Sequence, residues 1–80
     1  MTPEAIEQKV IEVLAEVLAM EPNEVSLDGD LRADFDASSL DLVQLIWTLE
    51  DELKEQIPEA VLEELHSAND IVQYILNKRS

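Results

Sequence analysis

The sequence SSLDLVQLIWTLEDEL, residues 38–53, decides the fold of this chain. Its apolar residues recur at spacings of three and four, which is the period of an α-helix and not of a strand. We therefore expect an amphipathic helix that begins at Ser38 or Ser39 and continues to about Lys54. Its buried stripe comprises Leu42, Leu45, Ile46, Leu49 and Leu53.

The N-terminal segment predicts a second helix of the same kind. Thr2 supplies a capping hydroxyl and Pro3 takes the first helical position, so the helix should begin there and run to about Met20. A long connection follows over residues 21–37, in which Pro, Asn, Asp and Gly interrupt regular structure. We expect this loop to be ordered by its own apolar residues. The buried residues expected of the first helix are Ile6, Val10, Val13, Leu14 and Val17, and those of the loop are Val25, Leu27, Leu31 and Phe35.

The C-terminal part of the chain predicts one short helix and one longer helix. Pro58 should open a short helical segment that ends at about Leu65. Ser67, with Asp70 three residues later, resembles a capping box and should start the last helix, which buries Ile71, Val72, Ile75 and Leu76. We therefore predict one all-α domain over residues 1–80, a small four-helix bundle with three longer helices and one short helix.

The charge balance restricts the partners of the protein. The chain has 19 acidic and 5 basic residues, for a formal net charge of -14. Such a surface repels nucleic acid and anionic lipid and attracts proteins rich in Arg and Lys. No apolar run is long enough to span a bilayer, and the N-terminal residues do not resemble a signal peptide. We expect a cytoplasmic monomer that binds basic proteins, with no nucleic acid and no membrane insertion.

Residues suited to catalysis or to metal binding are scarce. There is no cysteine, and His66 is the single histidine, at a predicted helix boundary where a surface or capping role is usual. The acidic loop fails as an EF-hand: counted from Asp30, the sixth position is Phe35, where glycine is required. We predict no catalytic residues and no metal site, so the protein should not be an enzyme.

The segment DFDASSLD, residues 34–41, delivers two serines to the start of the central helix. It is similar to the attachment motif of acyl carrier proteins, in which a Ser-Leu-Asp serine carries 4'-phosphopantetheine; aligned in this way, that serine is Ser39. The resemblance extends to LEDEL at residues 49–53, to Ile57-Pro58 and to the last helix. It implies an acyl carrier in fatty acid or related lipid or polyketide biosynthesis, with the arm supplied by coenzyme A.

Beside its buried stripe, the central helix has a second, exposed strip that apolar and acidic residues share. We call it the docking strip; it comprises Leu40, Val43, Gln44, Trp47, Glu50 and Asp51. The resemblance implies that a phosphopantetheinyl transferase and basic acyl-processing enzymes, such as ketosynthases and acyltransferases, bind there. Ser38 replaces the aspartate usual before the attachment serine, and Gln44 replaces a usual glutamate. The alternative is an acidic helical interaction module without a prosthetic group.

Overall fold

The computed structural model describes residues 2–79, which form helices and connecting loops without a named strand. Three α-helices are present, together with two short 3-10 helices, η1 and η2. Their order is α1 (Pro3–Leu18), η1 (Pro22–Glu24), α2 (Ser39–Leu53), η2 (Glu59–Glu64) and α3 (Ala68–Arg79). The predicted all-α architecture of three longer helices and a short one before the last is confirmed.

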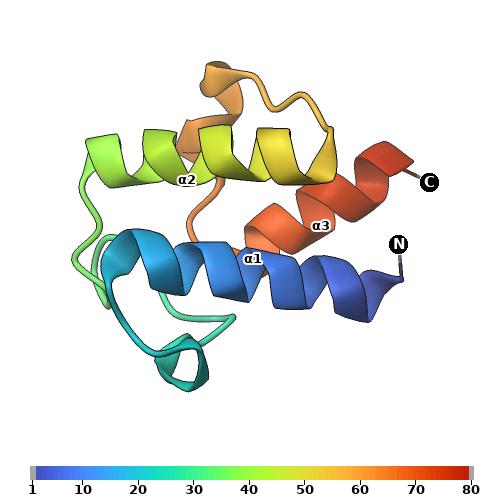
Figure 1. Cartoon of the computed structure of the whole chain (residues 1–80). Helices are drawn as coiled ribbons and strands as arrows, with labels where there is room; N and C mark the ends of the chain where they lie inside the picture. The colour runs from blue at the N-terminus through green and yellow to red at the C-terminus, as the bar shows by residue number, and fades with distance from the viewer. Residues whose placement is uncertain (1, 80) are drawn as a thin grey trace.

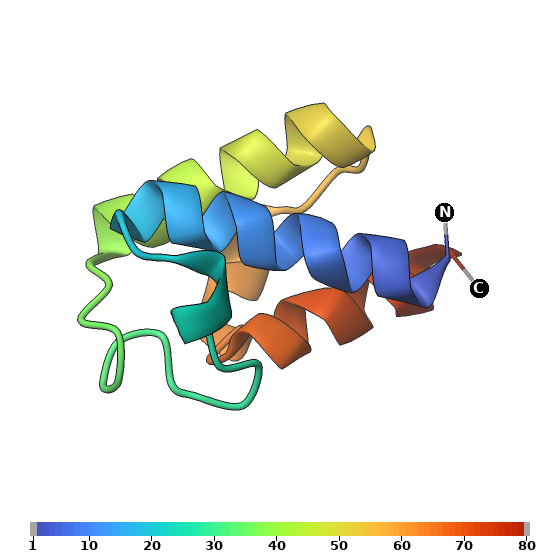
Figure 2. The ribbon, with the colours of Figure 1, turned by 60° about the horizontal axis from the view of Figure 1, so that its bottom comes forward.

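Helix α1 is the centre of the bundle. Both α2 and α3 pack against it and run in the opposite direction, and they make little direct contact with each other (Figures 1 and 2). The core is almost entirely aliphatic, with Ile6, Val10, Leu45, Leu49 and Ile75 fully buried. Within residues 2–79, no helix has the length and apolar character needed to cross a membrane. Because α2 and α3 both run antiparallel to α1, the start of α2 lies at the end of the bundle opposite the one where α1 begins and α3 finishes.

The predicted helix starts are confirmed in detail. The Ala5 N–H donates to Thr2 Oγ1 at 3.1 Å. The capping box of α3 is complete, because the Asp70 N–H donates to Ser67 Oγ and the Ser67 N–H donates to Asp70 Oδ2, both at 3.2 Å. Each cap satisfies backbone donors that have no partner within the helix.

Four details differ from the expectation. Helix α1 ends at Leu18, before Met20, because Ala19 adopts a left-handed conformation with φ 55°. Val17 and Leu76 are half-buried and lie at the margin of the core. The segment after Pro58 is a 3-10 helix, and η1 was not predicted at all. Both 3-10 helices are short and have no fully buried residue, so the hydrophobic period gives little signal for them.

The loop over residues 19–38 is held by hydrogen bonds and by apolar contacts. Leu31 is buried, and the other three expected residues, Val25, Leu27 and Phe35, pack against the core half-buried. The Leu31 N–H donates to the His66 carbonyl at 2.8 Å, and the Asn69 N–H donates to the Leu27 carbonyl at 2.9 Å. The prediction of an ordered loop is confirmed. Its hydrogen bonds to His66 and Asn69 attach the loop to the start of α3, and the loop then leads into α2.

Candidate functional site

The two serines at the start of α2 have different environments. Ser38 is the N-cap: its Oγ accepts from the Asp41 N–H at 3.1 Å, and its own N–H donates to Asp41 Oδ2 at 3.0 Å. Ser39 is the first residue of the helix and is exposed, and its hydroxyl has no hydrogen-bond partner in the described part of the chain. The pair therefore separates into one hydroxyl that caps the helix and one that is exposed and unpartnered within residues 2–79.

The residue before the serine pair anchors the loop to the core. Ala37 is buried, and its N–H donates to the Leu31 carbonyl at 2.9 Å. The neighbouring Asp36 has φ 57°, a left-handed conformation that aspartate tolerates better than most residues. Sequence reasoning did not identify Ala37, because a lone alanine between polar residues has no periodic signal. Its burial and its bond to Leu31 attach the chain to the core directly before the serine pair.

Asp30 organises the first half of the same loop. Its Oδ1 accepts from the N–H groups of Ala33 at 2.8 Å and Arg32 at 2.9 Å, and its own N–H donates to Asp34 Oδ2 at 2.8 Å. The backbone hydrogen bonds from Ala33 and then Arg32 hold the pKa of Asp30 below its ordinary value. The acidic residues thus bind backbone groups, and within residues 2–79 no cluster of three or more His, Cys or acidic side chains could hold a metal ion.

Gly29 has no side chain, and this allows the ring of Phe35 to pack close to its backbone. A Cβ atom built on Gly29 would lie 3.1 Å from Phe35 Cε2 and 3.2 Å from Phe35 Cζ. Phe35 in turn packs half-buried against the core, a short distance along the chain from the serine pair. Gly29 therefore allows the close approach that seats the loop.

The docking strip lies on the outer side of α2. Leu40 is 74% exposed and Trp47 is 60% exposed, and they are the two exposed large hydrophobic side chains within residues 2–79. Val43 is half-buried between them, and Gln44 and Asp51 are exposed. The structure therefore brings most of the predicted strip together on one accessible face of the helix.

Glu50 differs from the rest of the docking strip. Its side chain is half-buried, and Oε2 accepts from the Ile57 N–H at 3.0 Å. The carboxylate therefore holds the connection between α2 and η2, a role that the sequence did not indicate. An acidic residue seven positions before Ile57-Pro58 is too weak a pattern to predict such a contact.

His66 borders a hollow between the loop and η2. The hollow has a volume of about 200 Å³ and is lined by Leu31, Leu62 and Leu65, with Asp30, Arg32, Glu63 and His66 around them. The backbone of His66 donates to Asp70 Oδ2 at 3.0 Å and accepts from Leu31, so the residue lies at a helix boundary as expected.

Comparison with known proteins identifies the class to which this fold and site belong. The family model described as "Phosphopantetheine attachment site" matches residues 8–75. The chain is 37% identical over 71 residues to an acyl carrier protein of Campylobacter concisus (strain 13826), covering 89% of this chain and 92% of that protein. It is 35% identical over 79 residues to an acyl carrier protein of Prochlorococcus marinus (strain MIT 9515), covering 99% of each.

These matches place the chain in the class of carrier proteins that hold a prosthetic arm. It belongs to the acyl carrier protein family. The cofactor of that family is 4'-phosphopantetheine, and the protein is a carrier rather than a catalyst. Members interact with a phosphopantetheinyl transferase and with acyl-processing enzymes. Family membership therefore favours the carrier interpretation over the interaction module without a prosthetic group.

Proposed function

We propose that the Ser39 hydroxyl is the attachment point of 4'-phosphopantetheine, and that the chain, as a single domain over residues 1–80, presents thioester-bound acyl intermediates. The observation that carries this proposal is the division between the two serines. The Ser38 hydroxyl accepts a hydrogen bond from the helix backbone, whereas the exposed Ser39 hydroxyl has no partner within residues 2–79. A transferase can approach Ser39 without breaking the cap.

The start of α2 suits the phosphodiester that such an attachment creates. The Asp41 N–H is satisfied by Ser38 Oγ and the Leu42 N–H by the Ser38 carbonyl, each at 3.1 Å. The N–H groups of Ser39 and Leu40 have no hydrogen-bond partner within residues 2–79. Unpaired N–H groups at a helix N-terminus favour an anion, and so does the helix dipole. The arm itself supplies the thiol that a chain without cysteine lacks.

The docking strip supports the choice of partners. Leu40 and Trp47 offer apolar area, and exposed Asp51 offers a charge to a basic surface. We propose that the transferase and then basic acyl-processing enzymes, such as ketosynthases and acyltransferases, bind this strip in fatty acid or related lipid or polyketide biosynthesis. The expected location is the cytoplasm, and the expected state is a monomer.

The hollow between the loop and η2 is a site where part of the acyl chain could bind. Leu31, Leu62 and Leu65 give it an apolar surface, and the Leu31 carbonyl is hydrogen-bonded to Ala37, two residues before Ser39. An acyl chain that entered there would exchange water for aliphatic contacts. We propose this hollow as the entrance to the aliphatic core.

The proposal is tested by intact mass after incubation with coenzyme A and a promiscuous phosphopantetheinyl transferase. Wild-type protein and Ser38→Ala should gain one phosphopantetheinyl group, and Ser39→Ala should gain none. If Ser39→Ala were modified and Ser38→Ala were not, the attachment residue would be Ser38. If no transferase modified the wild type, the carrier function proposed here would be wrong.

A further inference from the structure

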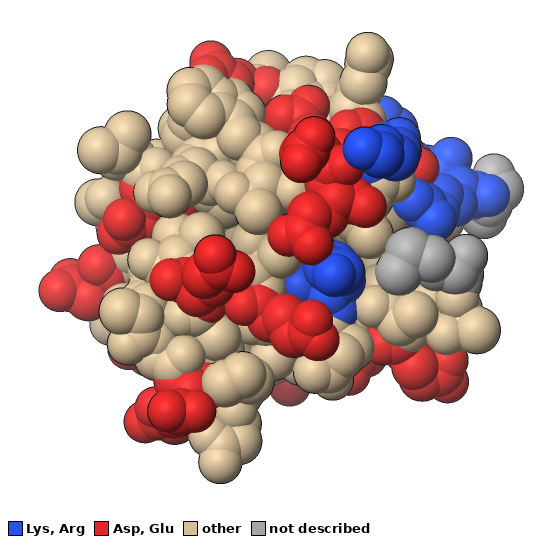
Figure 3. Space-filling view, viewed as in Figure 1, with Lys and Arg blue, Asp and Glu red and all other residues tan. Residues whose placement is uncertain are grey.

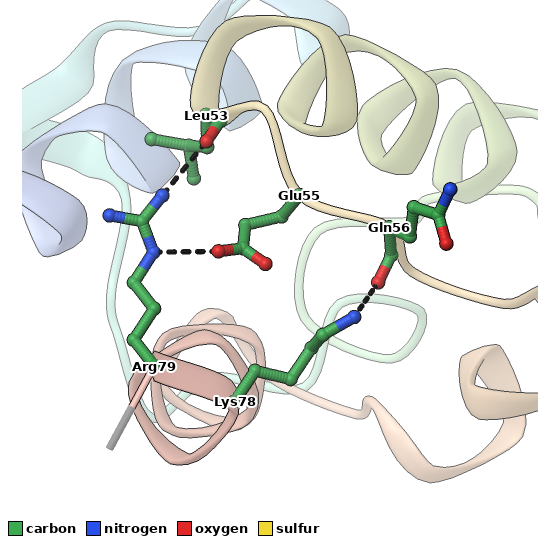
Figure 4. A network of polar contacts seen from close by, with 5 residues as sticks. All are labelled: Leu53, Glu55, Gln56, Lys78 and Arg79. Atoms are coloured by element: carbon green, nitrogen blue, oxygen red, sulfur yellow. Dashed lines mark hydrogen bonds and ion pairs between the residues drawn. The ribbon is translucent and has the colours of Figure 1, made fainter.

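The end of the bundle opposite Ser39 contains a compact network of polar contacts between α3 and the segment after α2 (Figure 4). Arg79 donates from Nε to Glu55 Oε1 at 2.9 Å and from Nη2 to the Leu53 carbonyl at 2.8 Å. Lys78 donates from Nζ to the Gln56 carbonyl. The Ile57 N–H also donates to Glu50 Oε2. Side chains of α2 and α3 therefore hold the three consecutive residues 55–57 and the last residue of α2, Leu53.

The network supplies what α2 lacks at its C-terminus. Its last turn has no basic residue, and its final carbonyl groups cannot find partners within the helix. The Arg79 guanidinium caps the Leu53 carbonyl and places positive charge at the negative end of the helix dipole. Its ion pair with Glu55 is partly buried, with side-chain exposures of 28% and 18%, so solvent screens it less than a surface pair.

The segment that follows depends on this network because η2 itself is weakly held. None of its residues is fully buried, and it makes few contacts with the three long helices. Its far end is fixed by the buried Leu65 and by the bond from the Leu31 N–H to the His66 carbonyl. Its near end is fixed by Ile57, which is buried, and by the polar network. Releasing the near end would let η2 swing about the far end.

We propose that Glu50, Glu55, Lys78 and Arg79 form a latch that keeps η2 closed over the hollow, and that this latch, rather than the aliphatic core, sets how often η2 opens. Opening would move Leu62, which lines the hollow, away from Leu31 on the facing loop. The latch thus couples the C-terminal end of α3 to the opening of the hollow between η2 and the loop that precedes Ser39. The proposal concerns the unmodified chain and does not depend on where a prosthetic arm is attached.

Amide hydrogen exchange on the full-length protein tests the latch. In Arg79→Gln, exchange at Ile57 and Val61 should accelerate about tenfold or more, while exchange at Val10 and Leu45 in the core stays unchanged. The matched control is Lys9→Gln. It also removes one positive charge and one ion pair, since Lys9 Nζ lies 3.1 Å from Glu52 Oε1, but it should leave Ile57 and Val61 as protected as in the wild type.

Glu55→Gln separates the latch from overall charge repulsion, because it makes the net charge less negative while Arg79→Gln makes it more negative. Both should accelerate the same two amides. Equal acceleration in the core amides would mean that these contacts stabilise the whole fold, and would overturn the proposal. So would a slowing of exchange in Glu55→Gln, which repulsion alone predicts, or unchanged exchange at Ile57 in Arg79→Gln. Because Glu55→Gln relieves repulsion, it provides the test even if Arg79→Gln fails to fold.

Discussion

At the scale of single residues, the serine pair predicts two opposite phenotypes. Ser38→Ala removes the acceptor of the Asp41 N–H and should lower the free energy of unfolding by about 0.5–2 kcal/mol, the range for a lost N-cap. Ser39→Ala removes a hydroxyl that has no partner among residues 2–79 and should leave the melting temperature nearly unchanged. Chemical denaturation of both variants measures the difference. A larger loss in Ser39→Ala than in Ser38→Ala would contradict the assignment of the cap.

Ser38→Asp extends this prediction to the transferase. Aspartate caps a helix about as well as serine, so stability should be retained. The variant restores the residue usual before the attachment serine in this family, and a standard transferase should modify it faster than the wild type. The initial rate of modification at limiting transferase measures this effect, and equal rates would mean that the transferase does not read this position.

Asp30 predicts a dependence of stability on pH. Its pKa in the folded protein lies below the ordinary value, so its carboxylate stabilises the fold above that ordinary value, and this contribution is lost as pH falls through the folded pKa. In Asp30→Asn an oxygen acceptor remains but the charge does not. The variant should melt below the wild type at pH 7, and the two melting temperatures should converge as the wild-type carboxylate is protonated. A constant difference down to pH 3 would contradict this account.

At the scale of helices, two neighbouring acidic residues of α2 have different roles. Asp51 is exposed, whereas Glu50 accepts from the Ile57 N–H. Asp51→Lys should therefore slow association with a basic partner enzyme at low salt and leave melting unchanged, because long-range attraction controls the encounter rate. Glu50→Lys should lower the melting temperature as well. Stopped-flow binding and thermal melting separate the two effects, and equal loss of stability in both variants would contradict them.

The helices themselves were predictable because each long helix repeats an apolar residue every three or four positions. The start of α2 was also predictable, since Ser38 and Asp41 have the spacing of a capping box. The sequence did not indicate η1, the burial of Ala37 or the contact from Glu50 to Ile57. These features depend on single contacts between distant segments, which leave no periodic pattern in the chain. The same holds for the bonds from Arg79 to Leu53 and Glu55.

At the scale of the whole molecule, charge is distributed unevenly. On the face of Figure 3, Lys and Arg gather toward the end where α1 begins and α3 finishes, whereas the end where α2 begins shows acidic and uncharged residues. The end of the molecule where α2 begins therefore shows little positive charge on this face. We expect a basic partner to be attracted first to the end where α2 begins, because opposite charges steer the encounter.

The net charge of -14 predicts a strong response to salt. Like charges on so small a body repel one another, and salt screens this repulsion over about 8–10 Å at 0.10–0.15 M ionic strength. The melting temperature at pH 7 should rise with added sodium chloride and with magnesium, although two ion pairs, Lys9–Glu52 and Arg79–Glu55, are weakened at the same time. Calorimetry across a salt series measures the balance. A falling melting temperature would mean that the ion pairs outweigh the repulsion.

The most direct test of the central claim is to locate the prosthetic arm in the unmutated protein. Trypsin should release residues 33–54 as one peptide that contains both serines, because cleavage follows Arg32 and Lys54. Tandem mass spectrometry of this peptide after modification distinguishes fragments that break between Ser38 and Ser39. The account predicts the phosphopantetheinyl mass on the fragment that begins at Ser39 and an unmodified fragment that ends at Ser38. The arm on Ser38, or on any residue outside this peptide, would contradict it.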